Sequence, residues 1–375
     1  MDIHTGTLGH FLNFELWQEA IKLLNFQVAA QETNRHFKTL SMIYYKKLGD
    51  TVHVLSDAEY FSMKVANNLF YGLQDEFVIY PYVTPKPGLG LRNYKFLSYP
   101  LRVLYYAIGL YFLRISDEYL RNFYAKRSNI CSYYGGSLRF ENNNLVVTKN
   151  NIYFVEYYKK FRYQIRRETS RQRENHIVIK FDIQNYYDEI SLPILLDFIS
   201  HTCKLSQLRS MSFDEDTKEQ ITFFFRYLAH DGLGIPQSDN IIMSSSLGYL
   251  YLVFGDMLIE SELLKFDSIV EHYKIIRYED DIYISVYFKA HCNRRIQDEF
   301  AEALGSRGAD ILYYKLGLKL NPKTRFFWLS DDKHLSELKA SLKKVSPEYH
   351  FSDENEDETP NTKVDNIFDE LTKLK

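Results

Sequence analysis

The chain has 375 residues, 45% hydrophobic and 25% charged, a composition typical of globular proteins. Its formal net charge of −3 excludes a uniformly basic surface, so any nucleic-acid-binding surface must be local. Three cysteines without a CxxC pair argue against a disulfide framework or a structural zinc site and favour the reducing cytoplasm. The first residues lack the pattern of a secretory leader, and we expect no membrane-spanning segment.

The N-terminal part of the chain is predicted to be mainly helical. Apolar residues recur at helical spacing from Phe11 to Leu24. Ser56 and Glu59 form a capping box before an amphipathic stretch that reaches about Tyr71. The helical part is expected to end before residue 80.

Proline and glycine crowd residues 80–90, which predicts a loop or the turn of a hairpin. A short strand is expected at 94–99, followed by a long helix over about 101–120.

Residues 153–167 predict an amphipathic helix with aromatic side chains on one side. Its other side is basic and carries Lys159, Lys160, Arg162, Arg166 and Arg167, and Arg171 and Arg173 extend it. This segment is the strongest local positive patch in the sequence. A solvated helix face and a phosphate-binding surface explain it equally well.

Acidic residues stand at the ends of predicted strands from residue 177 onward. Ile177–Asp182 is a strand that ends in a carboxylate, and 273–278 and 282–287 are strands joined by Glu279, Asp280 and Asp281. The sequence therefore predicts a hairpin with acids at its tip.

Helical patterns flank these strands, at 244–254 and at 292–316, the second with a break near Gly305. The order strand, helix, hairpin, helix and strand predicts an α+β fold with a sheet covered by helices on one face.

Phosphoryl transfer onto a hydroxyl uses two metal ions about 3.5–4 Å apart, one at the attacking oxygen and one at the leaving group. Carboxylates on neighbouring strands can hold such ions. Asp182 and Asp280 form a suitable pair if their strands are adjacent in the sheet.

Five segments in order resemble motifs of reverse transcriptases. IKFDIQNYYDEIS resembles motif A and IIRYEDDIYIS resembles motif C with its Tyr-x-Asp-Asp box. Residues 234–252, 316–324 and 326–329 resemble motifs B, D and E. The resemblance spans about residues 94–330 and implies a right-hand polymerase fold with fingers and palm, whose antiparallel palm sheet is covered by helices. An RNA-directed DNA polymerase activity is implied with it.

The resemblance also implies roles for single residues. Two Mg²⁺ ions, or Mn²⁺, would be held by Asp182 and Asp280, with the Ile183 carbonyl completing the set and Asp281 as a supporting acid. The substrates would be deoxynucleoside triphosphates. Nucleotide-binding and proton-transfer roles fall on four more side chains: Tyr187 as the steric gate, Gln237 in the nucleotide pocket, Lys95 at the triphosphate, and Lys323 as general acid for pyrophosphate.

Two positions depart from the family pattern. Ser238 replaces the usual glycine after Gln237, which changes how closely the backbone approaches a nucleotide. Glu279 replaces a small or apolar residue next to Asp280. It either accepts a hydrogen bond from a base, and so biases which nucleotide is added, or forms an ion pair with a neighbour such as Arg277.

The boundaries expected from these motifs are a helical N-terminal extension with the start of the fingers at 1–90, fingers at 91–175, and a palm at 176–330. A short helical segment with an acidic linker follows at 331–375. Helices at 334–344 and 364–374 leave little room for a full thumb, so we expect a reduced or atypical one.

A compact palm with an unusual thumb is similar to the bacterial abortive-infection and defence-associated reverse transcriptases, and within them to the type 3 defence enzymes. That resemblance implies anti-phage defence in the cytoplasm with a noncoding RNA, a DNA product, and a homo-oligomer or second polymerase subunit as partners, and no membrane. Template-independent or protein-primed synthesis by the same family is an alternative. So are a nucleotide cyclase and a catalytically quiet RNA-binding subunit.

Overall fold

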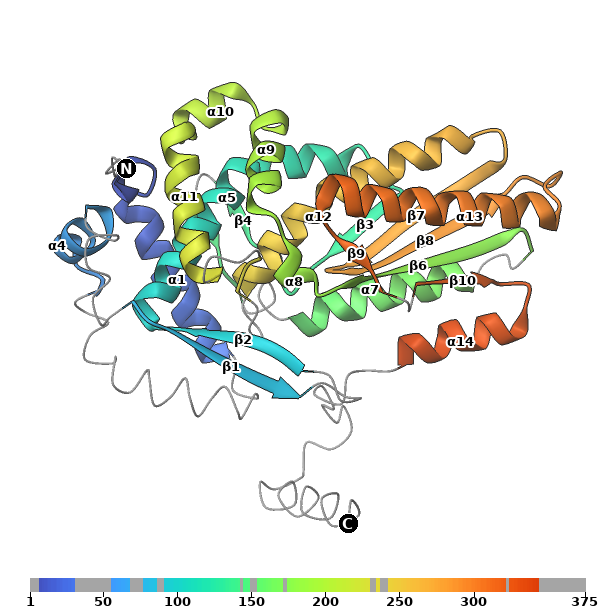
Figure 1. Ribbon diagram of the computed structural model, residues 1–375, viewed down its shortest axis with the longest axis horizontal. Helices are drawn as coiled ribbons and strands as arrows, with labels where there is room; N and C mark the ends of the chain where they lie inside the picture. Colours follow the sequence, from blue (N-terminus) through green and yellow to red (C-terminus); the bar gives the residue numbers. More distant parts are fainter. Residues whose placement is uncertain are drawn as a thin grey trace, which may run out of the picture. The chain divides into compact units, whose positions relative to one another are not determined.

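The structure is a computed structural model, and it describes residues 7–30, 55–67, 77–85, 91–141, 144–148, 154–170, 174–229, 234–236, 242–321 and 324–343. The chain divides into two compact units, Met1–Ser330 and Asp331–Lys375. The larger unit contains a six-stranded sheet and many helices (Figure 1). In the second unit the structure describes one helix, α14 (Asp332–Lys343), whose first turn is capped by the carboxylate of Asp331.

The N-terminal part is built on helix α1 (Phe14–Ala30), which packs along the long helix α5 (Tyr99–Ala125). The Trp17 indole donates a hydrogen bond of 2.8 Å to the carbonyl of Leu55, and this ties α1 to a following short helical segment. That segment comprises α4 (Ala58–Tyr60) and the π-helical turn η2 (Phe61–Ala66), and η1 (Leu8–His10) is a 3-10 turn before α1.

A two-stranded antiparallel hairpin follows, formed by β1 (Ile79–Pro85) and β2 (Leu91–Leu97). The expected hairpin is present, but residues 80–85 of the predicted turn belong to β1, and residues 86–90 lie outside the described residues. Helix α5 begins directly after β2 with Pro100 in its first turn, a position where proline costs no intrahelical hydrogen bond.

The central sheet has the strand order β10-β6-β8-β7-β3, and β9 pairs with the end of β6. Its strands are β3 (Ile130–Tyr133), β6 (His176–Gln184), β7 (Val270–Tyr278), β8 (Asp281–Phe288), β9 (Lys319–Leu320) and β10 (Arg325–Trp328). All pairs are antiparallel except β3 with β7, which is parallel. The prediction of a purely antiparallel sheet is wrong at this strand, because β3 follows the long helix α5 and enters the sheet in the direction of β7.

One face of the sheet packs on a helical layer. Alternate residues of the strands, such as Ile179 in β6 and Ile284 in β8, belong to a hydrophobic core shared with α5, α12 (Ile242–Leu263) and α13 (Arg294–Asp310). In Figure 1 α12 and α13 lie together on this side of the strands. The fold is thus an α+β arrangement, as predicted.

The other face of the sheet is covered as well. Helix α7 (Phe154–Thr169) places Phe161 against Tyr278 of β7 and Tyr283 of β8, with ring centroids 5.7 Å apart in both pairs. Figure 1 shows α7 on the side of the sheet opposite to α13. The prediction that helices cover one face only is wrong, because α7 buries its aromatic side on the second face.

The remaining described elements surround this centre. They are the short hairpin β4 (Arg139–Glu141) and β5 (Asn144–Val146), the helices α8 (Tyr186–Glu189), α9 (Leu192–Thr202), α10 (Leu205–Ser210) and α11 (Glu215–Ala229), the 3-10 turn η3 (Leu264–Phe266) and the π-helical turn η4 (Ile311–Lys315).

Two predicted element details differ from the structure, and a third falls on residues that it does not describe. The cap before residue 58 is Asp57, whose carboxylate accepts from the Glu59 N–H at 2.9 Å, and not Ser56. Helix α13 continues through Gly305 without the predicted break. Glycine stands at this position because a Cβ there would lie 2.7 Å from the Phe326 ring on the sheet. The predicted helix at 364–374 lies outside the described residues.

By length and composition alone, the segment Ile242–Phe266 could cross a membrane, contrary to the sequence-based expectation. In the structure this segment contains α12, and 72% of its most apolar stretch of 18 residues is buried inside the protein. A core helix that is hydrophobic all round has this pattern, because neighbouring elements cover each of its sides.

Candidate active site

Three aspartates lie at one end of the central sheet. Asp182 of β6 stands directly opposite Asp281 of β8 in the antiparallel register, and Asp280 precedes Asp281 in the turn from β7. Residues directly opposite in such a pair have their Cβ atoms about 4.5–5.5 Å apart on the same face. The predicted juxtaposition of β6 with the acidic hairpin is therefore present.

The hairpin is tight, because Tyr278 pairs with Asp281 and only Glu279 and Asp280 lie between them. Glu279 has φ 49°, in the left-handed region that costs a non-glycine residue about 1–2 kcal/mol. Glycine or asparagine would adopt this conformation more readily. The strained backbone at Glu279 is thus maintained by contacts of this residue.

The carboxylate of Glu279 accepts hydrogen bonds at both oxygens. The Tyr187 hydroxyl donates to one at 2.9 Å, and the Ser245 hydroxyl of α12 donates to the other at 2.8 Å. The backbone of Gly135 binds the same carboxylate, and the Glu279 N–H donates to the Tyr133 carbonyl at 3.0 Å. Burial raises the pKa of the Glu279 carboxyl, and these hydrogen bonds to the carboxylate act in the opposite direction.

Glu279 forms no ion pair with Arg277, which corrects one of the two interpretations of this residue. The Arg277 guanidinium instead binds Asp256 of α12, through Nε at 3.0 Å and Nη2 at 2.8 Å, and both side chains are fully buried. Arg277 Nη1 also donates to the backbone carbonyl of Glu279 at 3.3 Å. The buried pair thereby links the core helix to the turn that carries Asp280.

Asp281 has a cationic partner. Its carboxylate lies 3.1 Å from the amine of Lys180, which stands two residues before Asp182 in β6 and therefore on the same face. One oxygen of the Asp281 carboxylate therefore already binds an ammonium group.

Asp280 is buried beside other carboxylates. Burial, then the negative charges of Asp281 and Glu279 and also that of Asp182, raises the pKa of Asp280 well above its ordinary value. Carboxylates brought this close are stabilised by a cation between them. Hard oxygen ligands of this kind suit Mg²⁺ or Mn²⁺, so the residues present fit the implied ions.

Across the described ranges, no group of three or more His, Cys, Asp or Glu side chains is arranged as a complete metal-binding cluster. Magnesium sites in enzymes that act on phosphates commonly use one or two carboxylates, with water and substrate phosphates as the other ligands. Asp182 and Asp280 match such an incomplete protein ligand set. Ile183 lies in β6 opposite Leu320 of β9 and buries its side chain in the core.

Tyr187 is held on helix α8, immediately after β6, and the residue is buried. Its backbone carbonyl accepts from the Ile235 N–H at 2.9 Å, so the segment 234–236 packs onto α8. Gly234 has φ 92°, and a Cβ there would lie 2.6 Å from the Tyr187 carbonyl oxygen. Only glycine allows this approach, which fixes the backbone of Tyr187 next to the acidic turn.

Lys95 lies on β2, where its amine donates a hydrogen bond of 2.8 Å to the Leu228 carbonyl in the last turn of α11. A cation at a helix C-terminus interacts favourably with the carbonyl groups there. Burial lowers the pKa of Lys95, while the negative charge of Asp188, next to Tyr187, acts in the opposite direction. Lys95 therefore joins the β1–β2 hairpin to α11, near the carboxylate of Asp188 in α8.

Two predicted site residues, Gln237 and Lys323, lie outside the described residues, as does Ser238. Sequence reasoning missed Ser245, Lys180 and the pair Arg277–Asp256. The alternation of β6 would have placed Lys180 on the face of Asp182. The partners of Ser245 and Asp256 had no sequence signal, because they lie 34 and 21 residues away in the chain.

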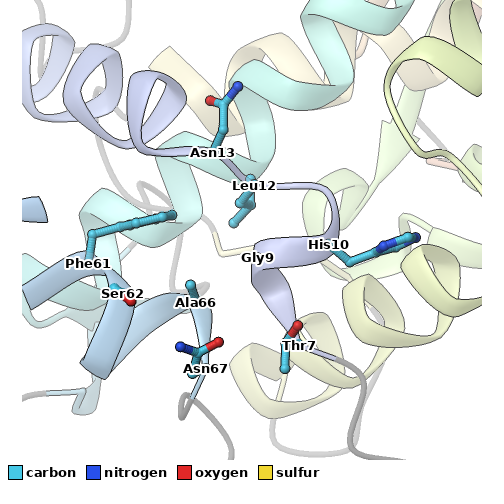
Figure 2. A pocket seen from close by; sticks show the side chains of 9 residues that line it. All are labelled: Thr7, Gly9, His10, Leu12, Asn13, Phe61, Ser62, Ala66 and Asn67. Carbon is cyan, nitrogen blue, oxygen red and sulfur yellow. The ribbon is translucent and has the colours of Figure 1, made fainter. Parts of the chain in front are cut away.

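A separate pocket, with a volume of about 440 Å³, lies between η1 and η2 (Figure 2). It is lined by Thr7, Gly9, His10, Leu12, Asn13, Phe61, Ser62, Ala66 and Asn67. Figure 2 shows the His10 ring directed away from Ser62 and Ala66, and this ring binds the Asp214 carboxylate at 2.7 Å. The pocket contains none of the candidate catalytic residues.

Neither a protein-family model nor a curated protein sequence matches this chain. Among solved structures it is similar to telomerase from Candida albicans in complex with the TWJ fragment of telomeric RNA, with a TM-score of 0.38 and 14% sequence identity. The match covers 66% of this chain, which spans 41% of the length of the telomerase chain.

Proposed function

We propose that this protein is an RNA-directed DNA polymerase, a reverse transcriptase that adds deoxynucleotides by phosphoryl transfer assisted by two Mg²⁺ or Mn²⁺ ions. The observation that carries the proposal is the register that sets Asp182 of β6 opposite Asp281, with Asp280 next to it in the tight β7–β8 turn. The ordered motifs in the sequence supply the reaction class, since the same acids alone fit other phosphoryl-transfer enzymes.

In this proposal Asp182 and Asp280 hold the ions, which activate the attacking hydroxyl and stabilise the leaving pyrophosphate. Lys180 keeps the Asp281 carboxylate oriented beside them and neutralises part of the negative charge. The Arg277–Asp256 pair holds the turn in place from the core side. These residues keep the carboxylates in fixed positions before substrate binds, which is the main protein contribution to this type of catalysis.

The Tyr187 ring is proposed to lie under the sugar of the incoming nucleotide and to exclude a 2′-hydroxyl. Its support is the position five residues after Asp182 and the contact of its hydroxyl with the acidic turn. Lys95 and Gln237 are proposed to bind the nucleotide, Lys323 to protonate pyrophosphate, and the Ile183 carbonyl to complete the metal coordination. These four assignments rest on the sequence resemblance.

The cellular role is also proposed from the sequence resemblance alone. It is anti-phage defence in the bacterial cytoplasm, with a noncoding RNA, a DNA product and a homo-oligomer or second polymerase subunit as partners. Sequencing the nucleic acid that co-purifies with the protein, before and after adding deoxynucleotides, tests the assignment. Extension that copies an RNA sequence supports it, and extension unrelated to any RNA present contradicts RNA-directed synthesis.

A further inference from the structure

The outward side of helix α7 carries a continuous basic stripe. From Lys159 onward its exposed residues are Lys159, Lys160, Tyr163, Arg166 and Arg167, spaced so that they fall on one helix face, and the acidic Glu156 lies exposed one turn before them. At the α-helical rise per residue, the stripe extends about 12 Å from Lys159 to Arg167. Tyr163 stands in the middle of it with 62% of its surface exposed.

The inner side of α7 is anchored to the strands that carry the candidate active site. Besides the Phe161 contacts, Tyr158 packs edge-on against Tyr278 with ring centroids 5.2 Å apart, directly before the turn with Asp280. At the other end Glu168 is buried, with its carboxylate 3.6 Å from the Lys274 amine, and its carbonyl accepts from the Tyr287 hydroxyl at 3.1 Å. The basic stripe is thus fixed relative to the sheet.

The charge of α7 differs from that of the whole chain. The helix has five basic and two acidic residues, while the formal net charge of the chain is −3. One of the two acids, Glu168, faces the sheet, which leaves the outer side more basic than the helix composition indicates. Two cations are also packed on rings, Lys160 on Tyr157 at 4.8 Å and Arg162 on Tyr158 at 5.8 Å. These contacts restrict the side chains before any ligand binds.

We propose that the outer face of α7 binds single-stranded RNA, namely the template strand next to the candidate active site. This inference rests on the proposed function for the choice of RNA. The basic side chains contact backbone phosphates, and Tyr163 offers an exposed ring on which one base stacks. At about 12 Å, the stripe is long enough to contact several consecutive phosphates of a nucleic-acid strand.

The test is equilibrium binding of a fluorescein-labelled RNA of about 12 nucleotides, a length within the site sizes of single-strand-binding proteins. Anisotropy follows the binding from about 0.1 to 1 M salt with EDTA present, so that no chemistry occurs. The variant Lys160→Ala with Arg166→Ala removes two charges from the stripe. The matched control, Arg209→Ala with Arg295→Ala, removes two exposed charges from α10 and α13. Circular dichroism and thermal unfolding establish that both variants are folded.

Each phosphate contact on a single strand contributes about 0.7 to the slope of log affinity against log salt. We therefore expect the stripe variant to lose about 1.4 from this slope and to bind about 25-fold more weakly at about 0.1 M salt, with the difference vanishing near 1 M. Tyr163→Ala should weaken binding about fivefold or more at every salt concentration, while Tyr163→Phe retains the affinity.

Equal affinities of the stripe variant and the control variant would overturn the proposal. The proposal is also overturned if the stripe variant binds RNA as the control does, but binds a DNA strand of the same sequence, or vesicles rich in phosphatidylserine, more weakly. Asp182→Asn separates this inference from the proposed function, since it should bind RNA as wild type does. If the Lys160→Ala, Arg166→Ala variant binds RNA more weakly as expected but Asp182→Asn still incorporates nucleotides, only the proposed function is contradicted.

Discussion

The Tyr187 hydroxyl donates a hydrogen bond of 2.9 Å to the Glu279 carboxylate, across 92 residues of chain. The proposed sugar gate is therefore joined to the residue that departs most from the reverse-transcriptase pattern. Ser245 donates to the other oxygen of the same carboxylate at 2.8 Å. Three elements, α8, α12 and the β7–β8 turn, meet in this contact.

Tyr187→Val removes the ring and should let ribonucleotides compete with deoxynucleotides, with discrimination falling about tenfold or more. Tyr187→Phe keeps the ring and loses only the hydroxyl, so it should retain most of the discrimination. The measurement is the ratio of kcat/KM for the two nucleotide classes. Unchanged discrimination in Tyr187→Val would show that the ring is only part of the core.

Glu279→Ala leaves the hydroxyls of Tyr187 and Ser245 without their acceptor. We expect it to reduce sugar discrimination in the same direction as Tyr187→Val, because the ring loses the contact that holds it. The double variant with Tyr187→Phe should then be no worse than Glu279→Ala alone, since both remove the same hydrogen bond. Sequenced products with altered base composition and normal sugar choice would instead support direct base recognition by Glu279.

Asp256→Ala leaves the Arg277 guanidinium buried without its carboxylate. Removing one member of a buried ion pair typically costs about 3–5 kcal/mol, so the free energy of unfolding should fall by about that amount. Glu299→Ala breaks the exposed pair of Arg295 and Glu299 and should cost less than about 1 kcal/mol. Urea unfolding of both variants measures the difference. Equal stabilities would contradict the structural role of the pair.

Lys95→Met removes the hydrogen bond to the Leu228 carbonyl at the end of α11. Hydrogen bonds with a charged partner contribute about 1.5–3 kcal/mol, so we expect a loss of that order in the free energy of unfolding. If Lys95 also binds the triphosphate, KM for deoxynucleotides rises in Lys95→Met, while Lys95→Arg keeps both properties in part. A variant as stable as the wild type would contradict the contact with α11.

The strands and the acidic turn could be predicted because they depend on local patterns. The strand patterns of 273–278 and 282–287, with the short link at 279–281, were sufficient to predict a hairpin with acids at its tip. The aromatic side of α7 was also visible from its spacing, but the face of the sheet that it covers was not. That position depends on contacts with Tyr278 and Tyr283, which lie far along the chain from Phe161.

The partners of the charged residues were harder to predict. Arg277 lies two residues from Glu279, yet its side chain points to the opposite face of the sheet from Tyr278 and pairs with Asp256 of a helix. Sequence proximity suggested an ion pair with Glu279, whereas strand alternation and helix packing determine the actual one. The parallel strand β3 likewise had no sequence signal, because its pairing with β7 joins distant parts of the chain, Ile130 with Ile275.

The most direct test of the proposed function follows incorporation of labelled deoxynucleotides on a primed RNA template with Mg²⁺, comparing the wild type with three folded variants. Asp182→Asn and Asp280→Asn should each abolish incorporation, because each removes a charge from the site that holds the ions. Asp281→Asn should lower it by about 10- to 100-fold, as expected for a residue that acts beside the ligands. Incorporation retained in Asp182→Asn or Asp280→Asn would contradict the account.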